Sequence, residues 1–340
     1  MREIIVKHLK KANRKSPMIA EMVKGIVLSR SVSSTKCANY ICGQTKKVSK
    51  IKRVERFYKG DYMANEDATG FMLGIAKTLI KLSLDRTNWQ YGDQDINALA
   101  LYGKAGNVAG LLNVEMLDNN GGSSDFADRK RVLEPVLERA ADRIEVLLGD
   151  REFFSFEFVS YLLEKGIPFV IRIKRNLKFA RPFVQALKHV SRIQRNVFVG
   201  KFKGKEIYLD ISGKKIKDDY VIVVSKGVHN PLQEYRRRFD IESFFKALKT
   251  AGFNIESTHI KKLNRLRALF LLCGIAYLLC VMMGFIAHNF VARIKFKRTL
   301  GCNQFSIFRY GIDWFTEIIF SGCYLTQNLF LPGAYQIRVR

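Results

Sequence analysis

Four side chains between residues 235 and 249 are of types that could bind a metal and a phosphate group from one helix face. Tyr235, Arg238, Glu242 and Lys249 follow one another at spacings of three, four and seven. At about 100° per residue, these steps place all four within roughly 60° of each other on a helix. A carboxylate that holds a divalent metal beside a phosphodiester needs such neighbours, because the cations take the phosphate oxygens. We interpret this face as part of an active site; the alternative is a solvated charged face.

Two aspartates could complete the set of acids. Asp85 follows the apolar run 78–84, and Asp150 follows the run 144–149, so each is predicted at the end of a short strand. Asp is also common in turns, and each acid alone therefore fits a structural role. The same structural interpretation, as turn or cap residues, applies to four other acids, Asp93, Asp95, Asp125 and Asp128.

Taken together, these segments resemble one enzyme family. The pattern Y-x(2)-R-x(3)-E-x(6)-K, with LDRTNW around Asp85 and GDREF around Asp150, resembles the motifs of DDE transposases of the insertion sequence 4 family, found in bacteria. The resemblance runs from about residue 75 to the C-terminus. It implies an α/β, RNase H-like fold and a catalytic triad of Asp85, Asp150 and Glu242 that holds Mg²⁺, or Mn²⁺ as a substitute. The expected phosphate contacts are those of Tyr235, Arg238 and Lys249, with both cations clear of the metal ions.

The resemblance also implies a function. It predicts a DNA transposase that cleaves at the terminal inverted repeats of its element and joins the ends to target DNA by metal-dependent phosphoryl transfer. Its partners would be double-stranded DNA and a second copy of the chain in an end-paired dimer. Three alternatives stay open: a metal-dependent DNA nuclease of the same fold, a non-catalytic DNA-binding descendant and, as the weakest, a membrane protein.

Composition favours a nucleic-acid partner. The 340 residues carry 58 Lys and Arg against 31 Asp and Glu, a formal charge of +27, which points to a polyanion. Because the basic residues are spread over the whole chain, DNA fits better than a membrane surface. The six cysteines form no C-x-x-C pair, and the polar N-terminus does not resemble a secretory signal. We therefore expect free thiols and a cytoplasmic, DNA-associated protein.

One segment argues against a simple soluble enzyme. Residues Ala268 to Ala287 form a run of 20 without a charge, which is long enough to span a bilayer. A fully buried core helix can be equally apolar on all sides. We favour burial, because a spanning helix so soon after Glu242 would hold the active-site face at a membrane and away from DNA.

The chain is expected to have three parts. Residues 1–65 are predicted as a helical, basic DNA-binding region, since the first 60 residues hold sixteen Lys or Arg against three Glu. Its helical spacing of apolar residues is set by Ile19, Met22, Val23, Ile26 and Val27. Residues 70–290 are predicted as the catalytic domain, and residues 291–340 as a basic, helical C-terminal tail.

Within the catalytic domain, the predicted order is three strands, a helix, a strand, a helix and a strand, which is the order of an RNase H-like domain. The resemblance implies that the first and fourth strands are neighbours, so that Asp85 and Asp150 meet. An antiparallel β insertion is predicted at about 176–230. From Ile171 to Lys205 there are eleven Lys or Arg and no acid, so this stretch is expected to contact DNA.

Overall fold

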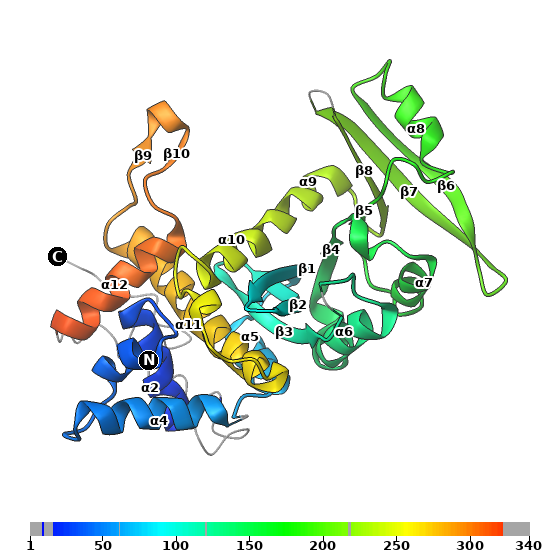
Figure 1. Cartoon of the computed structure of the whole chain (residues 1–340). Coiled ribbons are helices and arrows are strands. Elements are labelled where there is room, and N and C mark those ends of the chain that lie inside the picture. Colours follow the sequence, from blue (N-terminus) through cyan, green and yellow to red (C-terminus); the bar gives the residue numbers. More distant parts are fainter. Residues whose placement is uncertain (1–8, 10–15, 61, 120, 217–218, 322–340) are drawn as a thin grey trace.

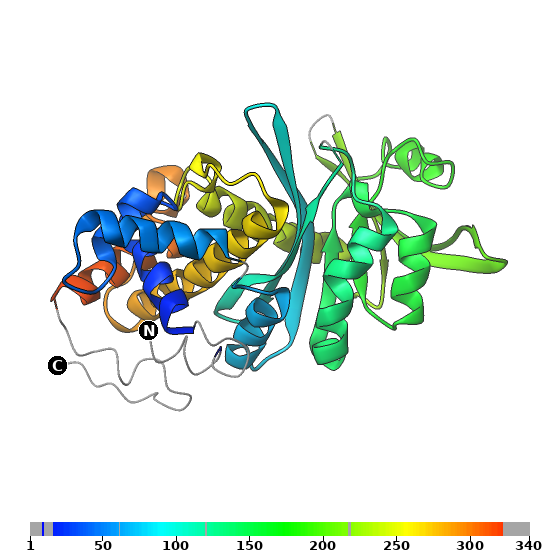
Figure 2. The ribbon, with the colours of Figure 1, turned by 60° about the horizontal axis from the view of Figure 1, so that its bottom comes forward.

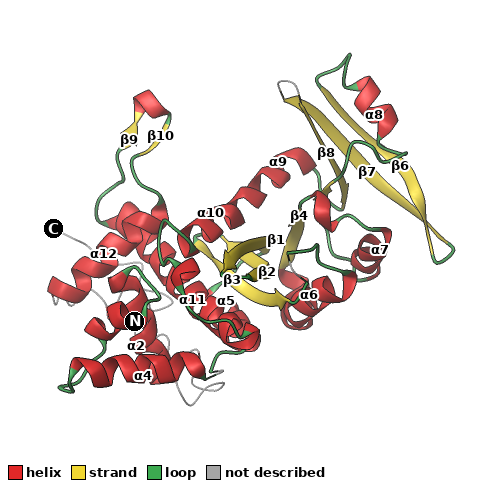
Figure 3. Ribbon diagram, viewed as in Figure 1, coloured by secondary structure: helices red, strands yellow, loops and turns green. Residues whose placement is uncertain are grey.

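A large mixed sheet forms the centre of the protein (Figure 1 and Figure 3). The computed structural model describes residues 9, 16–60, 62–119, 121–216 and 219–321. The eight strands lie in the order β3-β2-β1-β4-β5-β8-β7-β6. Their bounds are β1 Ile80–Tyr91, β2 Gln94–Ala105, β3 Val108–Leu117, β4 Ile144–Gly149, β5 Phe169–Arg172, β6 Arg192–Phe202, β7 Lys205–Ile216 and β8 Asp219–Lys226.

The first half of the sheet has the predicted order of elements. Strands β1, β2 and β3 form an antiparallel meander, and β4 and β5 follow as parallel neighbours of β1. Helix α6 (Phe126–Ala140) precedes β4, and α7 (Phe156–Glu164) connects β4 to β5. The implied adjacency of the first and fourth strands is therefore confirmed. This arrangement fits an RNase H-like fold.

Local chemistry defines where the two connecting helices begin. The Asp125 carboxylate accepts from the backbone N–H of Asp128, and the Asp128 carboxylate accepts from that of Asp125, which forms a reciprocal capping box for α6. The Ser155 hydroxyl accepts from the N–H of Phe158 at the start of α7. The cap role predicted for Asp125 and Asp128 is confirmed.

The apolar run near residue 280 is a core helix, as predicted. Helix α11 (Leu263–Phe290) has 28 residues and is, among the described residues, the one helix long and apolar enough to cross a membrane; 83% of its most apolar window is buried. It packs on β3, where a Cβ added to Gly274 would stand only 2.8 Å from the Leu111 side chain. Glycine at this position therefore allows the close approach of helix and sheet.

Helices from both ends of the chain surround α11. They are α2 (Ser16–Ser29), α3 (Ser34–Cys37), α4 (Lys47–Lys59), α5 (Asn65–Ile75) and α12 (Ile307–Ser321). The apolar residues predicted to share one face of α2 are all buried. Figure 2 shows these helices and α11 on one side of the sheet, with α6 and α7 on the other. The C-terminal segment also contains the short pair β9 (Phe296–Lys297) and β10 (Cys302–Asn303), and the last nineteen residues of the predicted tail lie outside the described residues.

Residues 176–230 extend the central sheet. They contain a short helix, α8 (Arg181–Ala186), and the three antiparallel strands β6, β7 and β8. Strand β8 pairs antiparallel with β5 from Phe169↔Lys226 to Arg172↔Val223. The three strands are therefore continuous with the sheet that carries the acids.

Candidate active site

Asp85 and Asp150 lie side by side where two parallel strands stop pairing. The parallel pairing of β1 with β4 ends at Leu84↔Gly149, and each acid is the next residue. The prediction that Asp85 ends its strand is wrong. Strand β1 continues to Tyr91, because beyond Asp85 it still pairs with β2 as a long hairpin, with Asp85 opposite Ala100. The end of the β1–β4 ladder, rather than the end of the strand, brings the two acids together.

A helical segment carries the remaining side chains across this point. It consists of α9 (Pro231–Tyr235), a 3-10 turn (Arg236–Arg238) and α10 (Phe239–Leu248) (Figure 1). The Tyr235 hydroxyl donates to Oδ1 of Asp150 at 2.9 Å. The Arg238 guanidinium donates to Oδ2 of Asp85 at 2.8 Å and to Oε1 of Glu242 at 2.5 Å. Tyr235 and Arg238, two side chains of the predicted face, therefore contact all three acids between them.

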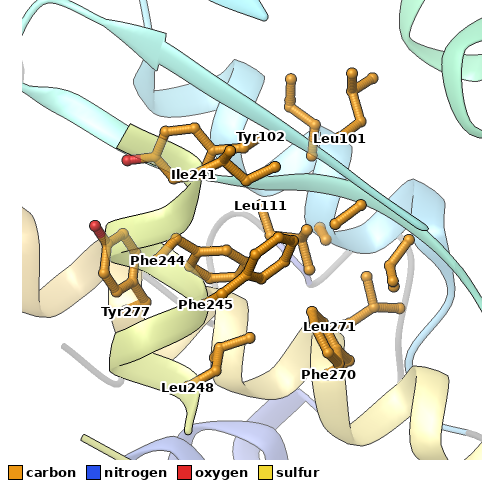
Figure 4. Close-up of a cluster of buried hydrophobic side chains, with 14 of the residues drawn as sticks. Leu101, Tyr102, Leu111, Ile241, Phe244, Phe245, Leu248, Phe270, Leu271 and Tyr277 are labelled. Atoms are coloured by element: carbon orange, nitrogen blue, oxygen red, sulfur yellow. The ribbon is translucent and has the colours of Figure 1, made fainter. Parts of the chain in front are cut away.

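The buried face of α10 fixes this position. Phe244 contacts the rings of Tyr102 on β2 and of Phe270 and Tyr277 on α11, with centroids 5.6, 6.3 and 5.0 Å away. Figure 4 shows these rings in one apolar cluster with other α10 side chains, Ile241, Phe245 and Leu248. Because the apolar side of α10 is held between the sheet and α11, its polar side, with Glu242, is directed to the acids.

Burial raises the pKa values of two side chains in the site. Burial raises the pKa of Asp85 to about 6, although Arg238 and the backbone N–H of Arg86 lower it; Asp150 and Glu242 raise it further. Burial also raises the pKa of Tyr235 to about 12, so its hydroxyl keeps its proton and remains a donor at neutral pH. The Arg238 side chain is only 8% exposed, and its Nε is buried without a hydrogen-bond partner. A buried carboxylate beside two others is stabilised by any nearby cation.

In the described part of the chain, no three His, Cys, Asp or Glu side chains are grouped as ligands of one metal ion. Arg238 lies between Asp85 and Glu242 and donates to both. The expectation that it binds phosphate clear of the metal ions stays a prediction. The donor set itself suits Mg²⁺, which prefers carboxylate oxygens. The pKa of Asp85 is raised mainly because its carboxylate is buried, and the charges of Asp150 and Glu242 add to this rise. The three carboxylates are of the type that would hold a divalent cation.

Lys249 stands at the C-terminal end of α10, where its backbone N–H still donates to the Phe245 carbonyl at 3.0 Å, and its side chain contacts the LDRTNW segment instead of the three acids. It follows the last residue of α10, and its backbone leaves the helix with φ −83° and ψ −118°. Its ammonium donates to the Asn88 carbonyl at 2.8 Å, pairs with Glu256 at 3.0 Å and lies 5.7 Å from the centre of the Trp89 ring. Lys249 thus marks the far end of the LDRTNW segment.

Three further charged residues contact the acids or their neighbours. The Arg86 backbone N–H donates to Oδ1 of Asp85 at 2.8 Å, and its Nε pairs with Glu152 at 3.0 Å. Arg172, at the end of β5, has Nη1 4.0 Å from Oδ1 of Asp150. Arg86 and Glu152 belong to the two motifs around the aspartates and could have been named from them. Arg172 gave no such signal, because only the β4–β5 pairing brings it near Asp150.

The family model for the transposase DDE domain matches residues 83–279, from just before Asp85 to within α11. The chain belongs to this transposase family. It therefore contains a DDE transposase domain, the domain of an enzyme that acts on DNA, and the match includes all three acids. No curated protein matches the chain. Among solved structures, endonuclease V from Bacillus subtilis is similar at a TM-score of 0.26 and 10% identity, over 57% of this chain and 82% of that one, which is too weak a likeness to support an argument.

Proposed function

We propose that this transposase cleaves DNA at the terminal inverted repeats of an insertion sequence of the insertion sequence 4 type and joins the ends to target DNA. The observation that supports the proposal is a set of three hydrogen bonds: Tyr235 donates to Asp150, and Arg238 donates to both Asp85 and Glu242. Membership of the transposase DDE family supports the same chemistry. A solvated charged face does not explain an arginine that is buried between two acids.

Asp85, Asp150 and Glu242 are the proposed ligands of Mg²⁺, with Mn²⁺ as a substitute. Two bound ions would supply activation of the attacking oxygen and stabilisation of the leaving oxygen. Tyr235 holds Asp150 in place through its hydroxyl, and the Arg86 backbone N–H does the same for Asp85. Arg238 has the charge and the fork geometry to bind a phosphate oxygen when it is released from the acids. Lys249, beside Trp89, is proposed to bind phosphate further along the DNA.

DNA would also be held outside the acids. Exposed cations line α4, whose buried residues are Val54 and Phe57, and we propose residues 1–65 as a helical region that binds the element's ends. We propose residues 176–230 as a β insertion that contacts DNA, and residues 291–340 as a basic tail. A second copy of the chain would pair the two ends.

The test is an incubation of the purified protein with MgCl₂ and labelled DNA from the flanks of its own gene. Cleaved ends followed by joined products are expected for the transposase. Asp150→Ala should abolish both while DNA binding survives, and the exposed Asp142 in the turn before β4 provides the matched control, Asp142→Ala. Normal turnover by Asp150→Ala would refute the assignment of the acids. Cleavage without joining would favour a nuclease of the same fold.

A further inference from the structure

A basic cavity opens beside Asp150. It has a volume of about 370 Å³, and its walls come from the turn after β4, the end of β5 with the following loop, and the start of β8. The lining residues are Arg151, Arg172, Ile173, Lys174, Arg175, Asn176, Asp219 and Tyr220. Cavities of a few hundred Å³ are of the size that holds small ligands or parts of larger ones.

The charges in this cavity are not balanced. Four cations face one carboxylate, that of Asp219. Asp219 pairs with Arg175 at 3.0 Å and lies 3.7 Å from Arg172. Arg151 and Lys174 have no ion-pair partner among the described residues. Like charges held around one concave space repel each other unless an anion enters, and the walls of a cleft focus their field on it.

The position of the cavity indicates which anion enters. Arg151 directly follows Asp150 in sequence, and Arg172 both lines the cavity and stands 4.0 Å from Oδ1 of Asp150. The cavity is therefore contiguous with the acids at the carboxyl ends of β4 and β5, where α/β sheets commonly bind ligands. A DNA strand whose phosphate lies at the acids would bring a neighbouring phosphate and sugar towards this space. The Tyr220 ring adds an apolar wall to the guanidinium and ammonium groups.

We propose that this cavity binds a backbone phosphate of the DNA strand next to the one at the acids. The inference rests on the proposed function for the identity of the strand. Arg151 and Lys174 are the cations with free capacity, and Arg172 links the cavity to Asp150. The two remaining charged residues of the lining, Arg175 and Asp219, form an ion pair with each other.

The probe is the dinucleotide pTpT, with inorganic pyrophosphate as the second ligand, and binding is measured by calorimetry. The variant Arg151→Ala/Lys174→Ala removes two exposed cations without breaking an ion pair of the described structure. The control is Lys77→Ala/Lys262→Ala, which removes two exposed cations that lie outside the cavity and outside the regions proposed to contact DNA. Melting temperatures of both variants check that the fold is intact.

The cavity variant should bind pTpT at least about tenfold more weakly than the wild type, because charged hydrogen bonds to phosphate are lost. The control should stay within about twofold of the wild type, since its cations lie outside the cavity. Equally weakened pTpT binding in both variants would overturn the proposal, because the effect would then come from the overall charge of the protein. Pyrophosphate binding in the cavity without pTpT binding would also overturn it, in favour of a free phosphate. Failure of DNA cleavage with this binding pattern intact would instead count against the proposed function.

Discussion

Replacement of Arg238 by alanine is the sharpest test of how the acids are held together. The guanidinium of Arg238 donates to Asp85 and to Glu242. The Asp85 side chain is 19% exposed and that of Glu242 is 45% exposed, so water can replace the lost contact at Glu242 but much less at Asp85. Arg238→Ala therefore leaves one carboxylate buried without its cation.

The magnitude follows from the cost of an uncompensated buried charge. Removal of one partner of a buried ion pair costs about 3–5 kcal/mol. The Arg86 backbone N–H still donates to Asp85, and the Glu242 contact is screened by solvent, so we expect a loss of about 2–3 kcal/mol at neutral pH. For a chain of this size, that loss lowers the melting temperature by about 3–4 °C.

The loss should depend on pH in a defined direction. The pKa of Asp85 is raised from its usual 3.8 to about 6, so between these values the folded protein holds a proton that the unfolded chain releases. The cost of burying the charged form is thus fully present above pH 6 and disappears as the pH falls towards 4. Without Arg238 the pKa rises further. The difference in stability between the variant and the wild type should therefore shrink as the pH is lowered through 6.

The assay is thermal unfolding at neutral and at mildly acidic pH, with and without MgCl₂. Arg237→Ala is the matched control, because Arg237 is the exposed neighbour of the same type. Mg²⁺ should restore more stability to Arg238→Ala than to the wild type, since a ligand of the folded state alone raises stability. Equal melting temperatures of the two variants at neutral pH would refute the reasoning. So would a loss in Arg238→Ala that is the same at both pH values.

Three further outcomes are expected. Lys249→Ala should lower the rate of end joining by roughly one to two orders of magnitude, because one charged hydrogen bond to phosphate is lost. The control variant Lys246→Ala, at an exposed site on α10, should join ends at the normal rate. Mg²⁺ binding should weaken as the pH falls through about 6, because a proton then competes with the metal for Asp85, and Asp142→Ala should show the same profile. An Mg²⁺ affinity that is independent of pH in this range would contradict the assigned pKa. The exposed cations of α4 to neutralise are Lys52, Arg53 and Arg56. Their loss should reduce the slope of log binding constant against log salt concentration by about 0.9 for each lost phosphate contact. An unchanged slope would show that this helix does not bind the DNA ends.

Motifs and periodicity predicted most of the frame. The order of strands and helices up to β5 and the caps at Asp125 and Asp128 follow from local signals, because apolar periodicity and turn chemistry act over a few residues. The burial of α11 was instead inferred from its position soon after Glu242, because a run that is apolar on all sides also fits a membrane span. The neighbouring positions of Asp85 and Asp150 followed from a family resemblance. The parallel pairing of β1 with β4 joins residues more than sixty apart in sequence, and no local pattern encodes it.

The errors have a common physical origin in long-range contacts. Asp85 lies within its strand because β2 extends the β1 hairpin beyond the end of the β1–β4 ladder. The contacts of the Lys249 ammonium with Asn88 and Glu256 were not predicted either, because Asn88 lies on β1, far from Lys249 in sequence. Helical geometry correctly put Tyr235, Arg238 and Glu242 on one side, but it could not say what lay opposite them. For the same reason the link from Arg172 to Asp150 was not predicted.

The contacts of Arg238 suggest a role for this side chain both in the site without a metal ion and in the site with metal and DNA bound. Three carboxylates face two guanidiniums, those of Arg238 and Arg172, and the closer contacts are made by Arg238. Its Nε remains without a partner, so the acids do not use all of its donors. A divalent cation between the acids would replace the charge that Arg238 supplies and would repel the guanidinium. A phosphate group beside the acids offers the oxygen acceptors that the displaced guanidinium then requires. We therefore expect binding of a metal ion and binding of DNA to favour each other at this site, because the metal would displace a guanidinium that a DNA phosphate could then bind.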